Sequence, residues 1–158
     1  MYQIQMANTY TQLYIHAIFA VRNREGIISE TWAERLQQYI TTILQNNGHK
    51  MIAIGGMSDH LHLFFGYNPT ESLSHLIQEI KRDSSLWINQ EKLVNGKFYW
   101  QAGYGAFSYS HSQINAVANY VNNQKQHHTK QSFQDEYLKI LKDFKVEFDE
   151  KYIFKSLL

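Results

Sequence analysis

The stretch HKMIAIGGMSDHLHLFFGY, residues 49–67, contains two apolar runs separated by a short polar interruption. Each run has the length of a strand, and the interruption at Ser58 and Asp59 is typical of a tight turn. We therefore predict a strand over residues 49–59 followed directly by another over residues 60–67. Because a tight turn joins them, we expect the two strands to pair in an antiparallel sheet.

The rest of the chain alternates strand and helix patterns around this pair. Strand patterns are rich in aromatic and β-branched residues, whereas helix patterns repeat apolar residues every three or four positions. The other predicted elements are a strand over 9–22, a helix over 29–47, a helix over 71–90, irregular strand structure over 97–110, and helices over 112–128 and 132–144. This order predicts a ferredoxin-like, RRM-like α+β fold, with helices covering an antiparallel sheet and the 60–67 strand at its centre. We expect one domain over residues 1–158.

The composition excludes several classes of protein. Of the 158 residues, 44% are hydrophobic and 15% are aromatic, which is typical of a globular domain. Cysteine is absent, so disulfides and cysteine-based zinc sites are excluded. The N-terminus lacks the pattern of a signal peptide, and no apolar run approaches the roughly 18 residues that span a bilayer. We therefore expect a soluble, cytoplasmic protein without membrane contact.

Two short segments combine basic side chains. The formal net charge is only +1, so a surface that binds nucleic acid has to come from local clusters. The candidates for contacts with DNA are Lys81, Arg82, Lys125, His127, His128 and Lys130. On charge alone, a mixed solvated surface is an equal interpretation, and a basic helix end also interacts favourably with the helix dipole.

Two histidines separated by one residue lie in the strand predicted over residues 60–67. Side chains on a strand alternate between faces, so His60 and His62 point the same way and can chelate a divalent metal. Asp59 is placed to orient one of the imidazoles. His16, in the predicted first strand, is expected to be structural or to support a metal ligand from behind. Two ordinary histidines on a polar strand face remain the competing interpretation.

Tyr120 and Gln124 are four residues apart in the helix predicted over residues 112–128, so they share a helix face. A tyrosine can act as a covalent nucleophile, and an amide oxygen can bind a hard metal ion. Tyr120 is also one of eleven tyrosines, and packing of its ring in a core is the alternative. The histidines without such spacing, expected at the surface or in helix packing, are His49, His75 and His111.

Several ordered motifs carry a resemblance to a known family. They are DHLHLFF at 59–65, IKRDSS at 80–85, FYWQAGYGAFSYS at 98–110, YVNNQKQHH at 120–128 and SFQDEY at 132–137. Together they resemble the single-tyrosine HUH transposases, the TnpA-type enzymes of the smallest bacterial insertion sequences and their repeat-associated relatives. The resemblance covers most of the chain, and the ordered set is far more specific than the histidine pair alone.

The resemblance implies a metal-dependent transposase that cleaves and rejoins single-stranded DNA through a 5′-phosphotyrosine intermediate. In that interpretation Tyr120 is the nucleophile, and His60, His62 and Gln124 hold Mg²⁺ or Mn²⁺. The resemblance also implies recognition of DNA hairpins at the element ends and a homodimer that exchanges the helix carrying Tyr120. The alternative function is a domesticated protein that binds or processes hairpin DNA and no longer mobilises an element.

Overall fold

An antiparallel sheet forms the centre of the computed structural model, which describes residues 9–127 and 131–148. Its strands are β1 (Tyr14–Ala20), β2 (Lys50–Met57), β3 (His60–Gly66) and β4 (Gly105–Tyr109). Along the sheet the order is β2-β3-β1-β4, and every neighbouring pair is antiparallel. The predicted ferredoxin-like α+β fold is confirmed, with β3 and β1 at the centre of the sheet.

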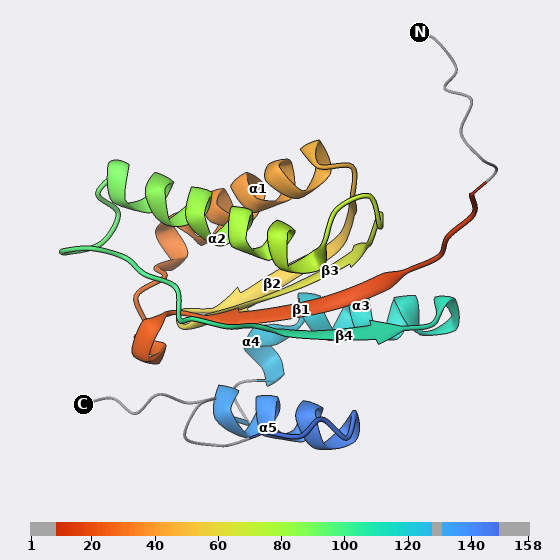
Figure 1. Cartoon of the computed structure of the whole chain (residues 1–158). Coiled ribbons are helices and arrows are strands. Elements are labelled where there is room, and N and C mark those ends of the chain that lie inside the picture. The colour runs from red at the N-terminus through yellow and green to blue at the C-terminus, as the bar shows by residue number, and fades with distance from the viewer. Residues whose placement is uncertain (1–8, 128–130, 149–158) are drawn as a thin grey trace, which may run out of the picture.

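Helices cover both faces of the sheet. They are α1 (Glu30–Asn46), α2 (Leu73–Gln90), α3 (Ile114–Asn122), α4 (Gln124–His127) and α5 (Phe133–Asp143), with 3-10 turns η1 (Arg22–Arg24) and η2 (His111–Gln113). Helices α1 and α2 lie on one face, and α3, α4 and α5 lie on the other (Figure 1). Among the described residues, no helix combines the length and the apolar character needed to cross a membrane.

The larger core lies between the sheet and helices α1 and α2. Helix α1 begins after Ser29, whose Oγ accepts the N–H of Thr31 at 3.2 Å. Apolar residues at helical spacing turn one face of α1 toward the sheet, and the buried ones are Trp32, Leu36, Ile40 and Leu44. They pack with Leu61, Leu63 and Phe65, which point to this face of β3. Each buried apolar side chain contributes roughly 1.5–3 kcal/mol, so this core fixes the central strands.

The opposite face of β3 carries the histidines. Two smaller apolar clusters lie there, one beneath α3 and one beneath α5. The α3 cluster contains Phe64, Val117 and Val121, and the α5 cluster contains Ile18, Phe107, Phe133 and Leu141. His16, His60 and His62 are buried on this face as well. Because β3 alternates its side chains, the leucines stabilise one core while the histidines face the other helices.

Helix α3 approaches strand β2 closely at Gly55. A Cβ atom at Gly55 would lie 2.3 Å from the backbone oxygen of Val121. Only glycine lets the end of α3 come this near to the sheet without displacement. This close approach sets the position of Tyr120, the residue before Val121, over the face that carries the histidines.

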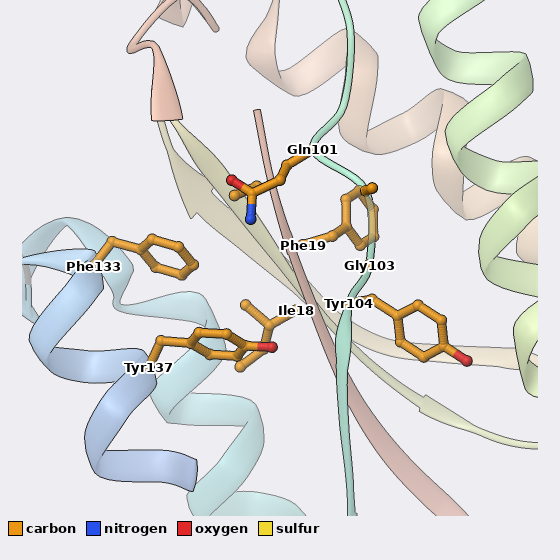
Figure 2. A pocket seen from close by; sticks show the side chains of 9 residues that line it. Ile18, Phe19, Gln101, Gly103, Tyr104, Phe133 and Tyr137 are labelled. Carbon is orange, nitrogen blue, oxygen red and sulfur yellow. The ribbon is translucent and has the colours of Figure 1, made fainter. Parts of the chain in front are cut away.

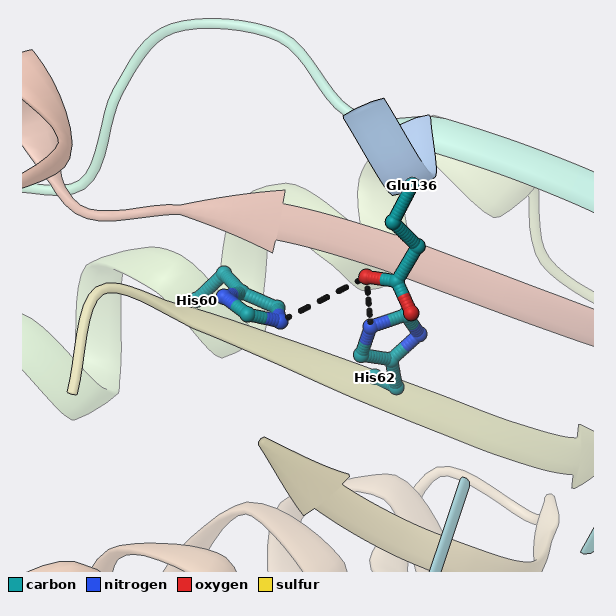
Figure 3. A group of neighbouring side chains, drawn as sticks. All are labelled: His60, His62 and Glu136. Carbon is teal, nitrogen blue, oxygen red and sulfur yellow. Dashed lines mark hydrogen bonds and ion pairs between the residues drawn. The ribbon is translucent and has the colours of Figure 1, made fainter. Parts of the chain in front are cut away.

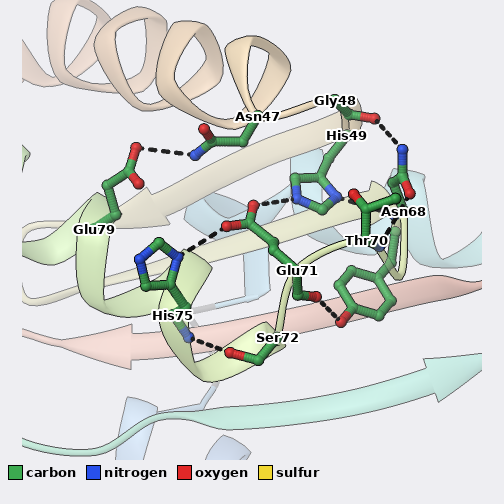
Figure 4. A network of polar contacts seen from close by, with 10 residues as sticks. Asn47, Gly48, His49, Asn68, Thr70, Glu71, Ser72, His75 and Glu79 are labelled. Carbon is green, nitrogen blue, oxygen red and sulfur yellow. Dashed lines mark hydrogen bonds and ion pairs between the residues drawn. The ribbon is translucent and has the colours of Figure 1, made fainter.

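A polar network fastens the start of β2 to the loop before α2 (Figure 4). His49 is 4% exposed, and its Nε2–H donates to Glu71 Oε1 at 2.7 Å while its Nδ1 accepts the N–H of Asn68 at 3.0 Å. The second carboxylate oxygen of Glu71 lies 2.9 Å from Nδ1 of His75. His75 is exposed, as expected. His49 was expected at the surface or in helix packing, and this prediction is wrong: it is buried in a loop, where both ring nitrogens have hydrogen-bond partners.

The helix predicted over residues 112–128 is divided in the structure. A 3-10 turn precedes α3, and α3 ends at Asn122. Asn123 has φ −106° and ψ 31°, and its N–H is shared between the carbonyls of Asn119 and Tyr120. Adjacent asparagines favour such a break because their side chains compete for backbone hydrogen bonds. Gln124 therefore begins α4 instead of continuing the helix of Tyr120.

The strands predicted at 9–22 and 97–110 are longer than the observed β1 and β4. The first strand covers only Tyr14–Ala20 of the expected 9–22, and the irregular region over 97–110 contains only the short β4. An isolated bridge between Val21 and Trp100 extends the sheet. Gly103, with φ +88°, turns the chain before β4.

Candidate active site

His60 and His62 meet a buried carboxylate from α5 (Figure 3). The Oε1 atom of Glu136 lies 3.2 Å from Nε2 of His62 and 3.7 Å from Nε2 of His60. Both histidines are fully buried, and Glu136 is only 2% exposed. Strand alternation brings the two imidazoles side by side, and α5 places the carboxylate above them.

The outer nitrogens of the two histidines have partners of their own. Asp59 Oδ1 lies 2.7 Å from Nδ1 of His60, and because a carboxylate only accepts, this Nδ1 carries the proton. His16 Nε2 lies 2.7 Å from Nδ1 of His62. Burial, followed by the neighbouring His62, holds the pKa of His16 well below its usual value, so His16 is neutral. In the tautomer that suits metal ligation, His16 Nε2 accepts the Nδ1–H of His62. With that tautomer, both Nε2 lone pairs point inward, as metal ligation requires.

Tyr120 reaches the same site from α3. Its hydroxyl donates a hydrogen bond to Oε2 of Glu136, whose other carboxylate oxygen, Oε1, lies next to His62. The ring centroids of Tyr120 and His62 are 5.8 Å apart in an edge-to-face arrangement. Burial raises the pKa of Glu136 to about 7, with His60 opposing the rise and Asp59 adding to it. The predicted nucleophile and the predicted ligands are thus brought together by one carboxylate.

Gln124 faces the histidines despite the break before it. Its side chain is 2% exposed, and its Nε2 donates to the backbone oxygen of Tyr120 at 3.2 Å. This bond directs the amide oxygen toward Nε2 of His60, at 3.3 Å. The site therefore contains both residues of the predicted pair, joined by one turn of backbone instead of one continuous helix.

The side chains converge in a way that fits a cation. The ligand atoms of His60, His62 and Glu136 all lie within 4.8 Å of one another, and Gln124 adds an amide oxygen. With the Nδ1 protons directed outward, the lone pairs of the two Nε2 atoms and of the Glu136 and Gln124 oxygens face one another. They repel one another unless a proton or a cation lies among them. Two imidazoles with two oxygens suit Mn²⁺, and the oxygens also suit Mg²⁺. The donor set is therefore compatible with either predicted ion.

Glu136 is the site residue that sequence reasoning missed. Ser132 starts α5 by accepting the N–H of Asp135 at 3.1 Å, which places Phe133, Glu136 and Tyr137 on one helix face. Phe133 stacks on the ring of His60 with centroids 4.1 Å apart. The only signal for Glu136 was its place within the SFQDEY motif, since no spacing links it to the histidines.

The predicted DNA-binding residues do not form one patch. Lys81 Nζ donates to the backbone oxygens of Gln101 and Gly103 on the α2 side of the sheet. Arg82 is exposed there and pairs with Asp83 at 3.0 Å. Lys125 lies in α4 on the opposite side of the sheet and pairs with Glu30 at 2.5 Å. His127 ends α4, while His128 and Lys130 lie outside the described residues.

Residues 9–124 match the sequence pattern of IS200-like transposases. The chain belongs to the IS200-like transposase family. The matched region contains the whole sheet, both histidines and Tyr120, and it ends at Gln124. Glu136 lies beyond it.

Known relatives support this assignment. This IS200-like transposase is 24% identical to the ISDra2 transposase TnpA of Deinococcus radiodurans over 119 residues, which cover 72% of this chain and 84% of the relative. A crystal structure of a Deinococcus radiodurans protein described as a transposase has a TM-score of 0.61 at 21% identity, covering 77% of this chain and 98% of that one. A REP-associated tyrosine transposase bound to a REP hairpin has a TM-score of 0.55 at 14% identity, covering 75% and 70%. At such identities the two structures establish a shared fold.

Proposed function

We propose that this IS200-like transposase cleaves and rejoins single-stranded DNA with Tyr120 as the nucleophile. The observation that carries the proposal is the contact of one buried carboxylate with the Tyr120 hydroxyl and with both histidines. Tyr120 also borders a hollow lined by His16 and Glu136. The alternative of ordinary histidines on a polar face is not favoured, since both are fully buried.

The proposed metal ligands are His60, His62, Gln124 and Glu136. Bound there, Mg²⁺ or Mn²⁺ would offset the negative charge that develops on the scissile phosphate. Asp59 and His16 keep the two imidazoles in the tautomer that presents Nε2, so they act through the ligands and not on DNA. Gln124 also holds the backbone of Tyr120, which couples the position of the nucleophile to that of the ligands.

The chemistry follows from the atoms around the Tyr120 hydroxyl. Attack of its oxygen on phosphorus forms a phosphotyrosine bond to the 5′ side and breaks the bond to the 3′ oxygen. Glu136 Oε2 accepts the hydrogen bond of Tyr120 and is placed to hold its proton. The departing 3′ oxygen takes up a proton and becomes a hydroxyl. Attack by this hydroxyl, or by that of another end, gives up the proton, breaks the phosphotyrosine bond and regenerates the tyrosine. No external energy source is needed, because each step exchanges one phosphodiester bond for another.

We extend hairpin recognition to this chain on the basis of its fold. The REP-associated structure that shares the fold is bound to a REP hairpin. The alternative, a domesticated hairpin-binding protein, is less well supported because Tyr120 and its partners are all present and in contact. Dimerisation with exchange of the helix carrying Tyr120 stays a prediction of the resemblance.

Covalent trapping tests the nucleophile. Single-stranded DNA from the flanks of the gene, incubated with the full chain and Mn²⁺, should give a protein–DNA adduct that denaturing gels resolve. Tyr120→Phe should abolish the adduct because the attacking oxygen is removed. Tyr39→Phe is the matched control, since Tyr39 stacks on Trp87 on the other face of the sheet. An adduct that persists in Tyr120→Phe would overturn the assignment.

A further inference from the structure

A groove lies between helix α2 and the segment that precedes β4. Its volume is about 430 Å³, and residues 99–104 form the wall opposite α2. Tyr99 is 43% exposed and Tyr104 is 38% exposed, and both line the groove. Two partly exposed aromatic rings therefore line one groove, where a ligand can contact them.

Hydrogen bonds within the protein hold this wall in place without a ligand. Asn89 bonds the backbone of Phe98 through both groups of its amide, at 2.7 and 3.1 Å. Trp100 Nε1 donates to Oγ of Ser84 at 2.9 Å. Phe98 and Trp100 point into the core, so Tyr99 between them points outward. The outward ring is thus fixed by its neighbours and loses little conformational freedom on binding.

Two arginine side chains lie near the two tyrosine rings. The guanidinium of Arg22 lies 4.1 Å from the centroid of the Tyr99 ring. Arg82 lines the groove with its side chain 60% exposed, and its partner Asp83 is the neighbouring residue. Lys81 is not available to a ligand in the same way, because its ammonium donates hydrogen bonds to the backbone carbonyls of Gln101 and Gly103 in the wall. Burial lowers the pKa of Lys81 to about 8. Lys81 positions the wall, and the two arginines face solvent.

The segment that forms this wall also borders the side of the sheet that carries the active site. Residues 101–104 also line a second hollow of about 170 Å³, which borders α5. Figure 2 shows Tyr104 on one side of this segment and Phe133 and Tyr137 on the other. Phe133 stacks on His60, so a chain that crosses the segment at Gly103 arrives beside the site. An added Cβ at Gly103 would meet no atom within 4 Å, which leaves this crossing open.

We propose that the groove between α2 and residues 99–104 binds the unpaired DNA strand that leads to the scissile phosphate. Bases stack on Tyr99 and Tyr104, and phosphates pair with Arg22 and Arg82. A single strand fits because its bases expose their faces, whereas a duplex hides them in its own stack. This inference rests on the proposed function, since it supplies the path by which single-stranded substrate reaches Tyr120.

Binding measurements on a non-cleaving background test the groove. In full-length Tyr120→Phe protein, fluorescence anisotropy compares oligothymidine with a blunt DNA hairpin from the flanks of the gene. Adding Tyr99→Ala or Tyr104→Ala should weaken oligothymidine binding by about tenfold, because stacking contributes roughly 1–3 kcal/mol per base. Tyr99→Trp should restore the affinity, since any aromatic face serves. Hairpin affinity should stay within about twofold.

Matched controls lie away from the groove. Arg82→Ala should reduce oligothymidine binding and its salt dependence, whereas Arg35→Ala, an exposed arginine paired with Glu91, should not. Tyr10→Ala serves as the control for an exposed tyrosine. Unchanged oligothymidine affinity in the groove variants, or equal loss for the hairpin, would overturn the groove assignment. Failure of the wild-type protein to form the Tyr120 adduct would overturn the proposed function instead.

Discussion

The preferred protonation state of Glu136 differs between the metal-free site and the metal-bound site. It is 2% exposed and touches the Tyr120 hydroxyl and the inner nitrogen of His62. Without a cation, burial favours the protonated carboxyl, which explains the rise of the pKa of Glu136 to about 7. A divalent cation among the ligands would favour the ionised carboxylate instead. The stability of the folded chain should therefore depend on pH and on metal through this one residue.

In EDTA, wild type should lose stability relative to Glu136→Gln as the pH rises from 4.5 to about 7. The folded state keeps the Glu136 proton up to about pH 7, whereas the unfolded chain releases it near 4.5. The folded state thus binds more protons in this window, so its stability falls as pH rises. The upper limit is about 3–4 kcal/mol, because each pKa unit corresponds to about 1.4 kcal/mol.

Chemical unfolding across this pH range measures the difference. Glu34→Gln, an exposed glutamate of α1, is the control for loss of a charge. A gap between wild type and Glu136→Gln that does not change with pH would contradict the expectation.

Metal should reverse this loss in wild type. Above pH 7, Mn²⁺ at about a hundred times its dissociation constant should raise the free energy of unfolding by about 2.7 kcal/mol. His60→Ala and Glu136→Gln should each gain less, because each lacks a ligand. Thermal unfolding with and without Mn²⁺ measures the gain, and an equal gain in all three proteins would show that the ion binds elsewhere.

At the scale of elements, local sequence patterns predicted individual strands and helices, whereas tertiary packing determined where helices break and which side chains meet. The 49–67 stretch predicted β2 and β3 closely, because apolar runs and a turn are local signals. The break at Asn123 was not predicted, since apolar spacing continues through it. Glu136 was not predicted as a site residue because its contact with His62 depends on where α5 packs, 74 residues along the chain. Strand spacing placed the histidine pair on one face, and helical spacing paired Tyr120 with Gln124, but their roles in one site were predicted only through the family resemblance.

Substitution of Gly55 tests whether the close packing of α3 on β2 positions Tyr120. Gly55→Ala should destabilise the fold by about 1–3 kcal/mol and reduce the Tyr120 adduct, because its Cβ would press on the backbone of Val121. Gly66→Ala is the matched control, as the nearest atom to its Cβ is 3.8 Å away. Unfolding curves and adduct yield are measured together. A stable Gly55→Ala protein with full adduct yield would show that α3 does not depend on this contact.

At the scale of the molecule, the question is which chain supplies Tyr120 to a given histidine pair. In the described chain, Tyr120 contacts Glu136 and His62 of the same subunit, and α3 packs on its own β2. The resemblance predicts instead a homodimer that exchanges this helix. Both arrangements bring the same side chains together, so the geometry of one site does not distinguish them. Complementation between two inactive subunits does.

If each chain uses its own Tyr120, co-refolded His60→Ala and Tyr120→Phe chains should form no adduct, because every site then lacks one essential residue. Exchange of α3 would restore about a quarter of wild-type sites, since half of randomly mixed dimers are mixed and one of their two sites is then complete. Mixing wild type with each variant controls for refolding yield, and sedimentation measures the oligomeric state. Adduct near a quarter of the wild-type amount would support the predicted helix exchange, and absence of adduct would contradict it; either result leaves the roles of His60 and Tyr120 intact.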